Sequence, residues 1–251
     1  MDPRNSINAS DVFQFQSLSS TAYSRSALEK MVGGTFLNYP NCVDAVIESS
    51  IENTISPYHI LSRILQEQGS SGSTLSSGKG YMVNGELKYV GYYNVFNIGA
   101  TGNTQKDIII NGLSRAEKEG WNSLVKSIIG GSKFLGSNYI DLGQNTLYFQ
   151  KFNVVKTPYY SHQYMQNILA AQNEGVAMKN VYSSNGIINS KFDFIIPLYN
   201  GMPQVPVSRP LTSASTYIGN INSEIKSIKL DKNSKGTYLY GESVIVEWID
   251  R

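Results

Sequence analysis

One carboxylate, Glu67, stands near the end of a short stretch that carries signals for both a helix start and a helix stop. Ser56 is a good N-cap and Pro57 suits the first helical position, while Gly69 supplies a left-handed stop after the last turn. At 100° per residue, Glu67 falls roughly 20° from the nearest residue of an apolar stripe. The sequence therefore predicts a short helix with a partly buried carboxylate in its final turn.

Two effects act on the proton of a carboxyl group at this position. Partial desolvation and the negative end of the helix dipole both favour the neutral acid. An acid that keeps its proton near neutral pH is what the cleavage of a glycosidic bond needs, because the leaving oxygen must be protonated as the bond opens. Arg63 lies four residues before Glu67, so a surface ion pair worth under ~1 kcal/mol is the alternative. Spacing alone leaves both interpretations open.

Composition limits the remaining classes of function. The 251 residues, 41% of them hydrophobic, suffice for one large core or one core with an appended module. A net charge of +2 with no basic stripe does not indicate nucleic acid as a partner. The single cysteine, Cys42, excludes an intramolecular disulfide, and two distant histidines without an HExxH pattern predict neither a metal site nor another cofactor.

No apolar run approaches 18 residues and no signal-peptide pattern opens the chain. We therefore expect no membrane contact, and interpret the chain as a domain excised from a longer secreted protein whose signal peptide is absent. Hydrophobic periodicity predicts mainly helices, a hairpin around Asn84-Gly85, a flexible serine-rich loop over 70–80 and a β-rich end. The expected domains are 1–205, with 1–40 as an extended arm packed on it, and 206–251 as a short β extension or truncated β-sandwich repeat.

Several element predictions are specific enough to test. We expect a strand at 12–15 and a helix from 41 to about 55. A helical region from 113 to 128 is expected to be interrupted near Gly120 and closed by Gly130-Gly131, with a weak helical continuation over 134–142. The segment 145–152 is predicted to be extended, and 162–177 to be helical. The predicted strands at the end of the chain cover 225–230, 237–240 and 244–249.

Six motifs in order resemble one known family. They are SPY with RILQE at 56–67, YNVFNIGA at 93–100, GW at 120–121, GQNTLY at 143–148, HQYMQNI at 162–168 and IPLYNGMP at 196–203. Their order over roughly residues 1–203 is similar to glycoside hydrolase family 73. The opening MDPRN and FQFQSLS at 13–19 resemble, more narrowly, the catalytic domain of a clostridial-type autolysin.

The resemblance implies a lysozyme-like α+β fold, mainly helical, with a small β-hairpin lobe and a C-terminal β extension. It implies an endo-β-N-acetylglucosaminidase that cuts the β-1,4 bond between N-acetylglucosamine and N-acetylmuramic acid in peptidoglycan, with Glu67 as general acid. Tyr164 matches a tyrosine that supports catalysis. The residues that match the substrate-binding segment of the family are Tyr93, Asn94, Phe96 and Asn97, although core packing is an equal alternative for Asn94 and Phe96.

The second catalytic group has no clean match. Glycosidases that use two carboxylates hold them about 5–5.5 Å apart when retaining and about 6.5–9.5 Å apart when inverting. Glu86, just after the predicted hairpin turn, is the best candidate for a base; the weaker candidates are Asp107, Glu117 and Glu119. The other possibility is participation by the acetamido oxygen of the substrate, with Tyr164 orienting it.

The sequence thus predicts a metal-independent, monomeric hydrolase that is secreted and associated with the cell wall, where its partner is the glycan strand of peptidoglycan. Two alternatives stay open. One is a muramidase or lytic transglycosylase on the same fold, and the other is a peptidoglycan-binding module without activity.

Overall fold

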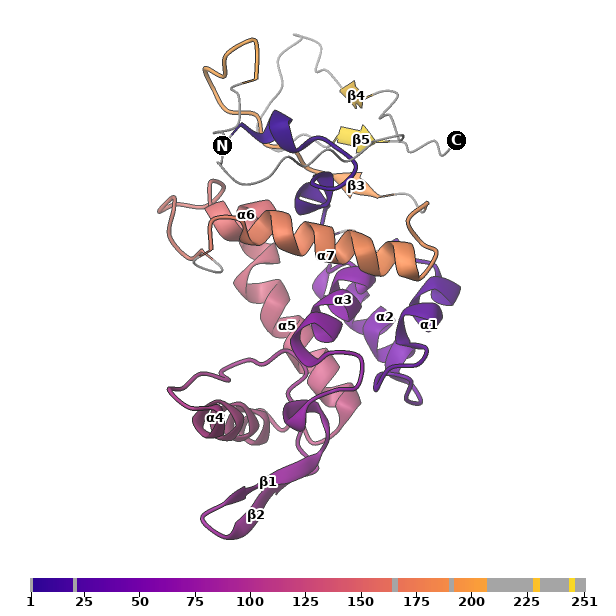
Figure 1. The fold of residues 1–251 in the computed structure, drawn as a ribbon, viewed down its shortest axis with the longest axis vertical. Helices are drawn as coiled ribbons and strands as arrows, with labels where there is room; N and C mark the ends of the chain where they lie inside the picture. Colours follow the sequence, from indigo (N-terminus) through magenta and orange to yellow (C-terminus); the bar gives the residue numbers. More distant parts are fainter. Residues whose placement is uncertain are drawn as a thin grey trace, which may run out of the picture. The chain divides into compact units, whose positions relative to one another are not determined.

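The computed structural model describes residues 2–19, 22–163, 167–189, 192–206, 228–230 and 244–246 (Figure 1). The chain divides into two compact units. We call Leu18–Gly143 the helical unit, and Met1–Ser17 together with Gln144–Arg251 the split unit. Glu67 lies in the helical unit. No helix in the described ranges is both long enough and apolar enough to cross a membrane.

The helical unit contains five α-helices, two 3-10 turns and one hairpin in its described residues. In chain order they are α1 Arg25–Val32, α2 Cys42–Asn53, α3 Pro57–Gln68, η3 Thr74–Ser76, β1 Lys79–Val83, β2 Glu86–Val90, α4 Gln105–Lys118, α5 Leu124–Asn138 and η4 Ile140–Leu142. Helix α2 packs along α5 and also contacts α3. The expected helix from residue 41 is therefore confirmed as α2.

Helix α3 begins and ends where its sequence signals predict. The Ser56 hydroxyl accepts a hydrogen bond from the His59 backbone N–H at 3.4 Å, Pro57 occupies the first turn, and Gly69 has a φ of 70°. In its apolar stripe Ile60, Leu61 and Ile64 are fully buried and Leu65 is half-buried, and its last turn carries Glu67. The two caps thus set the ends of α3 and place Glu67 in its last turn.

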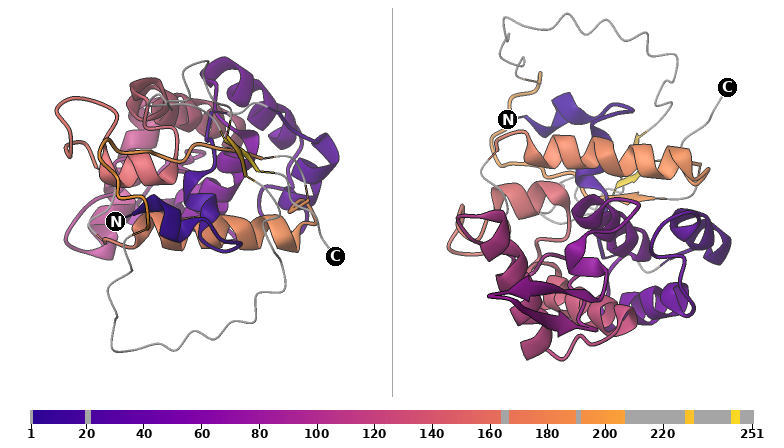
Figure 2. Two further views of the ribbon diagram at one scale, coloured as in Figure 1. Left: turned by 90° about the horizontal axis from the view of Figure 1, so that it is seen from above. Right: turned by 60° about the horizontal axis from the view of Figure 1, so that its bottom comes forward.

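The hairpin is confirmed, with the turn chemistry that the sequence predicts. Asn84 and Gly85 both have positive φ, as a type I′ turn requires, and Val83 pairs with Glu86 across it. Strand β1 contacts α4 (Figures 1 and 2), and two tyrosines of the hairpin pack on a small core cluster between them. That cluster consists of Leu75, Ile109 and Leu113.

Helix α5 does not end at Gly130-Gly131, so that prediction is wrong. The helix runs on to Asn138, and both glycines lie in its interior. A Cβ at Gly130 would collide with the Trp121 ring, and one at Gly131 would collide with the Phe96 ring. These glycines therefore allow close approach of two aromatic rings rather than a helix stop.

The split unit is built on aromatic packing. Its described elements are η1 Pro3–Ser6, η2 Val12–Phe15, α6 Leu147–Phe152, α7 Ala170–Ser184, β3 Asp193–Phe194, β4 Ile228–Leu230 and β5 Val244–Val246. Phe13 makes edge contacts with Tyr182, Phe192 and Phe194 at ring-centroid distances of 5.5–5.8 Å. Gly175 of α7 lies directly against the backbone of Gln14.

Three element predictions in the N-terminal and middle parts of the chain need correction. Residues 12–15 form the 3-10 helix η2 instead of a strand, and 1–40 is not extended throughout, because η1, η2 and α1 lie in it. Residues 147–152 form α6, where Thr146 caps the helix and the rings of Tyr148 and Phe152, one turn apart, are in tilted contact at a centroid distance of 4.9 Å. The helix predicted over 162–177 is shifted, since α7 spans Ala170–Ser184.

The β-rich end is described only in part. Strands β3, β5 and β4 form an antiparallel sheet in that order, and Phe194 pairs with Val244. The predicted strand at 237–240 lies outside the described residues. The domain boundary after residue 205 stays a prediction.

Candidate active site at the end of helix α3

Glu67 sits at the surface end of a buried charged pair. Its Oε1 lies 3.1 Å from the Arg63 guanidinium, and the two side chains are 23% and 10% exposed. Its Oε2 accepts a hydrogen bond of 2.8 Å from the Asn97 amide. The ion pair that the sequence left as an alternative is therefore present, and the Glu67 side chain is partly exposed to solvent.

Asn97 is itself held by a second side chain from α3. Gln68 donates to the Asn97 amide oxygen at 2.7 Å, which leaves the Asn97 nitrogen facing Glu67. The Gln68 amide also donates to the backbone carbonyls of Asn94 and Val95. Its own oxygen accepts from the Ser73 hydroxyl at 2.5 Å. A chain of three side-chain hydrogen bonds thus runs from Ser73 through Gln68 and Asn97 to Glu67.

The other residues of the segment 93–100 divide between core and surface. Asn94 is fully buried, and its amide donates to the carbonyls of Ile98 and Gly112 at 2.8 Å each. Phe96 is buried against Gly131. Both occupy the core role that the sequence left open, whereas Tyr93 and Asn97 are only half-buried.

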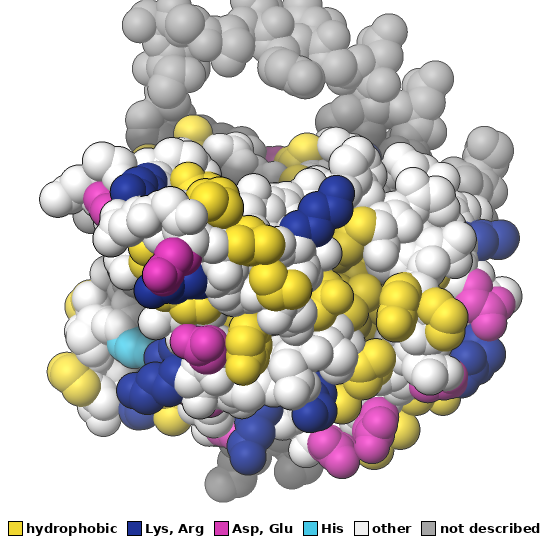
Figure 3. Space-filling view, turned by 90° about the horizontal axis from the view of Figure 1, so that it is seen from below, with side chains coloured by type: hydrophobic (Ala, Val, Ile, Leu, Met, Phe, Trp, Pro, Cys, Tyr) yellow, Lys and Arg dark blue, Asp and Glu magenta, His cyan; other side chains and the backbone are white. Residues whose placement is uncertain are grey.

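The two basic side chains of α3, Arg63 and His59, differ in charge. Burial and, to a smaller extent, the nearby charge of Arg63 together lower the pKa of His59 to about 3. His59 is therefore neutral near pH 7, and Arg63 carries the positive charge of this helix face. Figure 3 shows positive and negative side chains interspersed on one face of the molecule. No cluster of three or more potential metal ligands occurs among the described residues.

Comparison of the sequence with known proteins identifies relatives of this chain. No family model matches the sequence. The bifunctional autolysin of Staphylococcus epidermidis is 32% identical over 203 residues, which is 79% of this chain, and that of Staphylococcus aureus strain MSSA476 is 33% identical over 147 residues, or 58%. The aligned parts are 15% and 11% of those proteins, so the chain spans a small part of the relatives' length.

Solved structures agree in fold and sequence. The crystal structure of the major bifunctional autolysin has a TM-score of 0.57 at 27% identity, covering 74% of either chain. The chain is homologous to the glucosaminidase domain of the bifunctional autolysins. The mainly helical, lysozyme-like α+β fold is confirmed. The narrower clostridial-type assignment is a misstatement, because the homology is to bifunctional autolysins such as those of staphylococci.

Glu86 lies apart from Glu67 in this glucosaminidase homologue. Its side chain is 76% exposed at the start of β2, and its one described partner is Lys88 at 3.4 Å. The hairpin tip projects away from α3 within the helical unit (Figure 1). No described contact joins the two carboxylates. Tyr164 lies outside the described residues.

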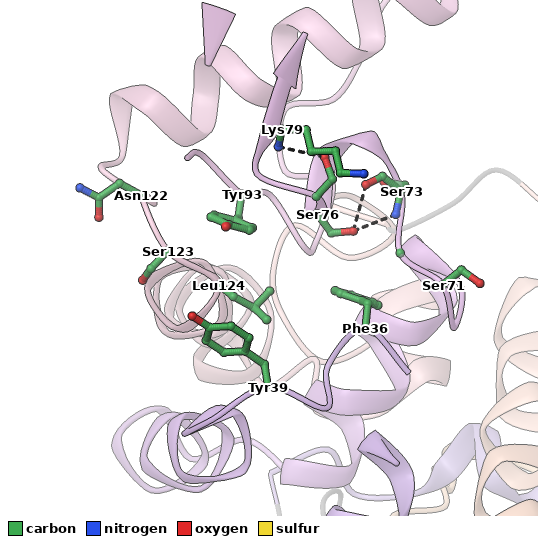
Figure 4. A pocket seen from close by; sticks show the side chains of 12 residues that line it. Phe36, Tyr39, Ser71, Ser73, Ser76, Lys79, Tyr93, Asn122, Ser123 and Leu124 are labelled. Carbon is green, nitrogen blue, oxygen red and sulfur yellow. Dashed lines mark hydrogen bonds between the residues drawn. The ribbon is translucent and has the colours of Figure 1, made fainter. Parts of the chain in front are cut away.

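A pocket of about 540 Å³ opens beside the chain of hydrogen bonds (Figure 4). The loop after α3, the loop before α2, and the start of α5 form its walls. Tyr93 and Ser73 connect it to the predicted site, because Tyr93 lies in the predicted substrate segment and Ser73 begins the chain to Glu67. Its further lining includes Phe36, Tyr39, Ser76, Lys79 and Asn122.

The sequence did not indicate Gln68, Ser73 or the pocket. The serine-rich loop was interpreted as flexible from its composition, yet it contains the 3-10 helix η3 with a capping box between Ser73 and Ser76. The S-x-x-S spacing was the available signal. Gln68 gave none, because the groups to which its amide donates lie 26 to 29 residues ahead in the chain.

Proposed function

We propose that this chain is an endo-β-N-acetylglucosaminidase that hydrolyses the β-1,4 bond between N-acetylglucosamine and N-acetylmuramic acid in peptidoglycan. Homology to autolysin glucosaminidases supports the reaction class. Structures of Staphylococcus aureus autolysin E with a NAG-NAM disaccharide, bound to a catalytic Glu-to-Ala mutant, and with a muropeptide support the substrate. The observation that carries the proposal is the partly exposed side chain of Glu67 at the end of α3, whose two carboxylate oxygens are each held by a different partner.

Glu67 is the proposed general acid. It gives its proton to the glycosidic oxygen as the bond from that oxygen to the anomeric carbon breaks, and water then adds to the sugar. Asn97 and Arg63 position the carboxyl group, since one contacts each oxygen.

For the second catalytic role we favour the acetamido oxygen of the substrate, oriented by Tyr164. Glu86 is the competing proposal, as a base that activates water. The exposure of Glu86 and its ion pair within the hairpin support the first mechanism over the second. Peptidoglycan hydrolysis in this form requires neither a metal nor another cofactor. We also propose that the enzyme is monomeric, secreted and associated with the cell wall.

Mass spectrometry of digested peptidoglycan tests the reaction. We expect new reducing ends that are N-acetylglucosamine, released by the wild-type chain and absent with Glu67→Gln. Reducing N-acetylmuramic acid would instead identify a muramidase, and an anhydro product a lytic transglycosylase. Sedimentation with peptidoglycan without any new ends would identify a binding module.

A further inference from the structure

The pocket beside α3 has a chemically biased lining. Its walls carry three aromatic rings, those of Phe36, Tyr39 and Tyr93, and one cation, Lys79. Figure 4 shows the rings of Phe36, Tyr39 and Tyr93 on different walls of the pocket. No Asp or Glu is among its lining residues in the described chain. Such a lining favours an anionic ligand with some apolar surface.

Part of the polar lining is already used for folding. The hydroxyls of Ser73, Ser76 and Ser77 bond to the loop itself or to Gln68. Within the described chain, by contrast, the side chains of Tyr39, Lys79 and Asn122 make no hydrogen bond or ion pair. The same holds for the Tyr93 hydroxyl. The serines therefore build the wall, and the four other groups remain available to a ligand.

The ring of Tyr93 is fixed against the loop. Gly78 has a φ of 67°, and a Cβ there would collide with the Tyr93 phenol. Tyr93 also donates its backbone N–H to the Trp121 carbonyl at 3.0 Å. A preformed aromatic wall lowers the entropy cost of binding. The pocket is thus a built feature of the helical unit.

We propose that this pocket binds the peptide stem of peptidoglycan, with a carboxylate of the stem on Lys79 and its backbone amides on Asn122 and the two tyrosines. The inference rests on the proposed function and adds a specificity site to it. A peptide stem supplies carboxylates, amides and small apolar side chains, which match the lining group by group. A neutral glycan supplies hydrogen-bond acceptors but no opposite charge for Lys79.

The position of the pocket suits a substituent of the cleaved glycan. Three hydrogen bonds link its wall to Glu67, from Ser73 to Gln68 at 2.5 Å, on to Asn97 at 2.7 Å, and to the carboxylate at 2.8 Å. A stem of three residues extends about 10 Å. This length is the reach that we propose for a stem whose sugar lies at Glu67.

Binding to the Glu67→Gln background tests the proposal without hydrolysis. Calorimetry would compare a soluble muropeptide with the same muropeptide amidated at its carboxylates. We expect the carboxylate form to bind roughly two- to fivefold more tightly, because Lys79 is exposed and an ion pair with an exposed lysine is worth under about 1 kcal/mol. Adding Lys79→Gln should remove that difference, whereas Lys88→Gln, which changes a lysine of the same hairpin outside the pocket lining, should keep it.

Three results would overturn the proposal: equal affinity of the two forms, no measurable binding of the muropeptide, or a Lys79→Gln variant that retains the difference. Failure of the proposed function is separate. It appears as no N-acetylglucosamine ends when the wild-type chain is incubated with glycan strands whose stems an amidase has removed. Cleavage of those strands with equal affinity in calorimetry would reject the stem pocket alone.

Discussion

The end of α3 and the β1–β2 hairpin each present a glutamate, and the two are held in opposite ways. Glu67 follows a buried helix, is 23% exposed, and has a different partner on each oxygen. Glu86 is the first residue of β2, directly after the hairpin turn. Its side chain is 76% exposed and has one described partner, Lys88. A general acid needs a fixed direction and limited water, and only the α3 glutamate has both in the described structure.

The difference comes from what each element packs against. Helix α3 buries most of its residues, so its last turn cannot shift without disturbing the core. The hairpin exposes Met82 and Leu87 and rests on a small cluster through two tyrosines. Position at the end of a packed helix therefore favours catalysis, whereas position at the tip of a ribbon favours contact with a bound polymer.

The largest expected effect separates the two glutamates directly. Glu67→Gln should reduce the rate of wall lysis by roughly 10³-fold or more, because the leaving oxygen loses its proton donor. Glu86→Gln should reduce it less than about threefold, because an exposed carboxylate loses little when it is neutralised. Turbidity of a peptidoglycan suspension measures both rates.

Either half of this comparison can fail by itself. Substantial lysis by a folded Glu67→Gln variant would remove Glu67 from the mechanism. A loss of two or more orders of magnitude with Glu86→Gln would make Glu86 the base and exclude acetamido participation as the main route. Circular dichroism establishes that each variant remains folded.

A pH effect on stability should mark α3 and not the hairpin. The pKa of His59 is about 3 in the folded chain against about 6.5 when unfolded, so only the unfolded chain takes up this proton between those values. The stability due to neutral His59 is complete above about pH 6.5 and is lost as pH falls. By pH 4.5 the loss is roughly 2–3 kcal/mol.

Urea unfolding at several pH values measures this loss. His59→Leu should flatten the dependence between pH 6.5 and 4.5, whatever its effect on stability at pH 7. Lys88→Gln on the hairpin is the control and should keep the wild-type slope. An unchanged slope in His59→Leu would show that His59 is not the group that titrates.

A smaller effect is expected where Asn97 supports Glu67. Asn97→Gly accepts the positive φ of 52° at this position and removes only the amide. Loss of its hydrogen bond should reduce kcat about tenfold, near 1.4 kcal/mol, with little change in KM. Gln68→Leu, which frees the Asn97 amide to turn, should have the same sign. A change in KM alone would contradict positioning and indicate substrate contact.

The sequence was sufficient where the signal is local. The caps of α3 and the Asn84-Gly85 turn lie within a few residues of what they control, so both elements were predicted. The helix end predicted at Gly130-Gly131 was wrong, because these glycines make room for aromatic rings from other segments of the chain. The aromatic residues of 147–152 are typical of a strand, yet tertiary packing and a Thr146 cap make them helical.

In the candidate site, too, the sequence predicted the local contacts and missed those between distant segments. Glu67 could be placed at the edge of the core from helical spacing, and Arg63 could be named as its ion-pair partner. The roles of Asn97, Gln68 and Ser73 required the path of the chain, because 29 residues separate Gln68 from Asn97. Family motifs supplied Asn97 without its partner.

The smallest expected effect tests how α5 supports Asn97 through the Phe96 ring. Gly131→Ala gains up to about 1 kcal/mol in helix propensity but forces a methyl group into the Phe96 ring, which costs roughly 1–3 kcal/mol. We expect a net loss near 1 kcal/mol in urea unfolding, and a lower kcat, because Phe96 adjoins Asn97. Gly136→Ala on the same helix has more room and should be neutral or stabilising. Equal stability of the two variants would mean that Phe96 moves freely, so α5 would not hold the segment that positions Glu67.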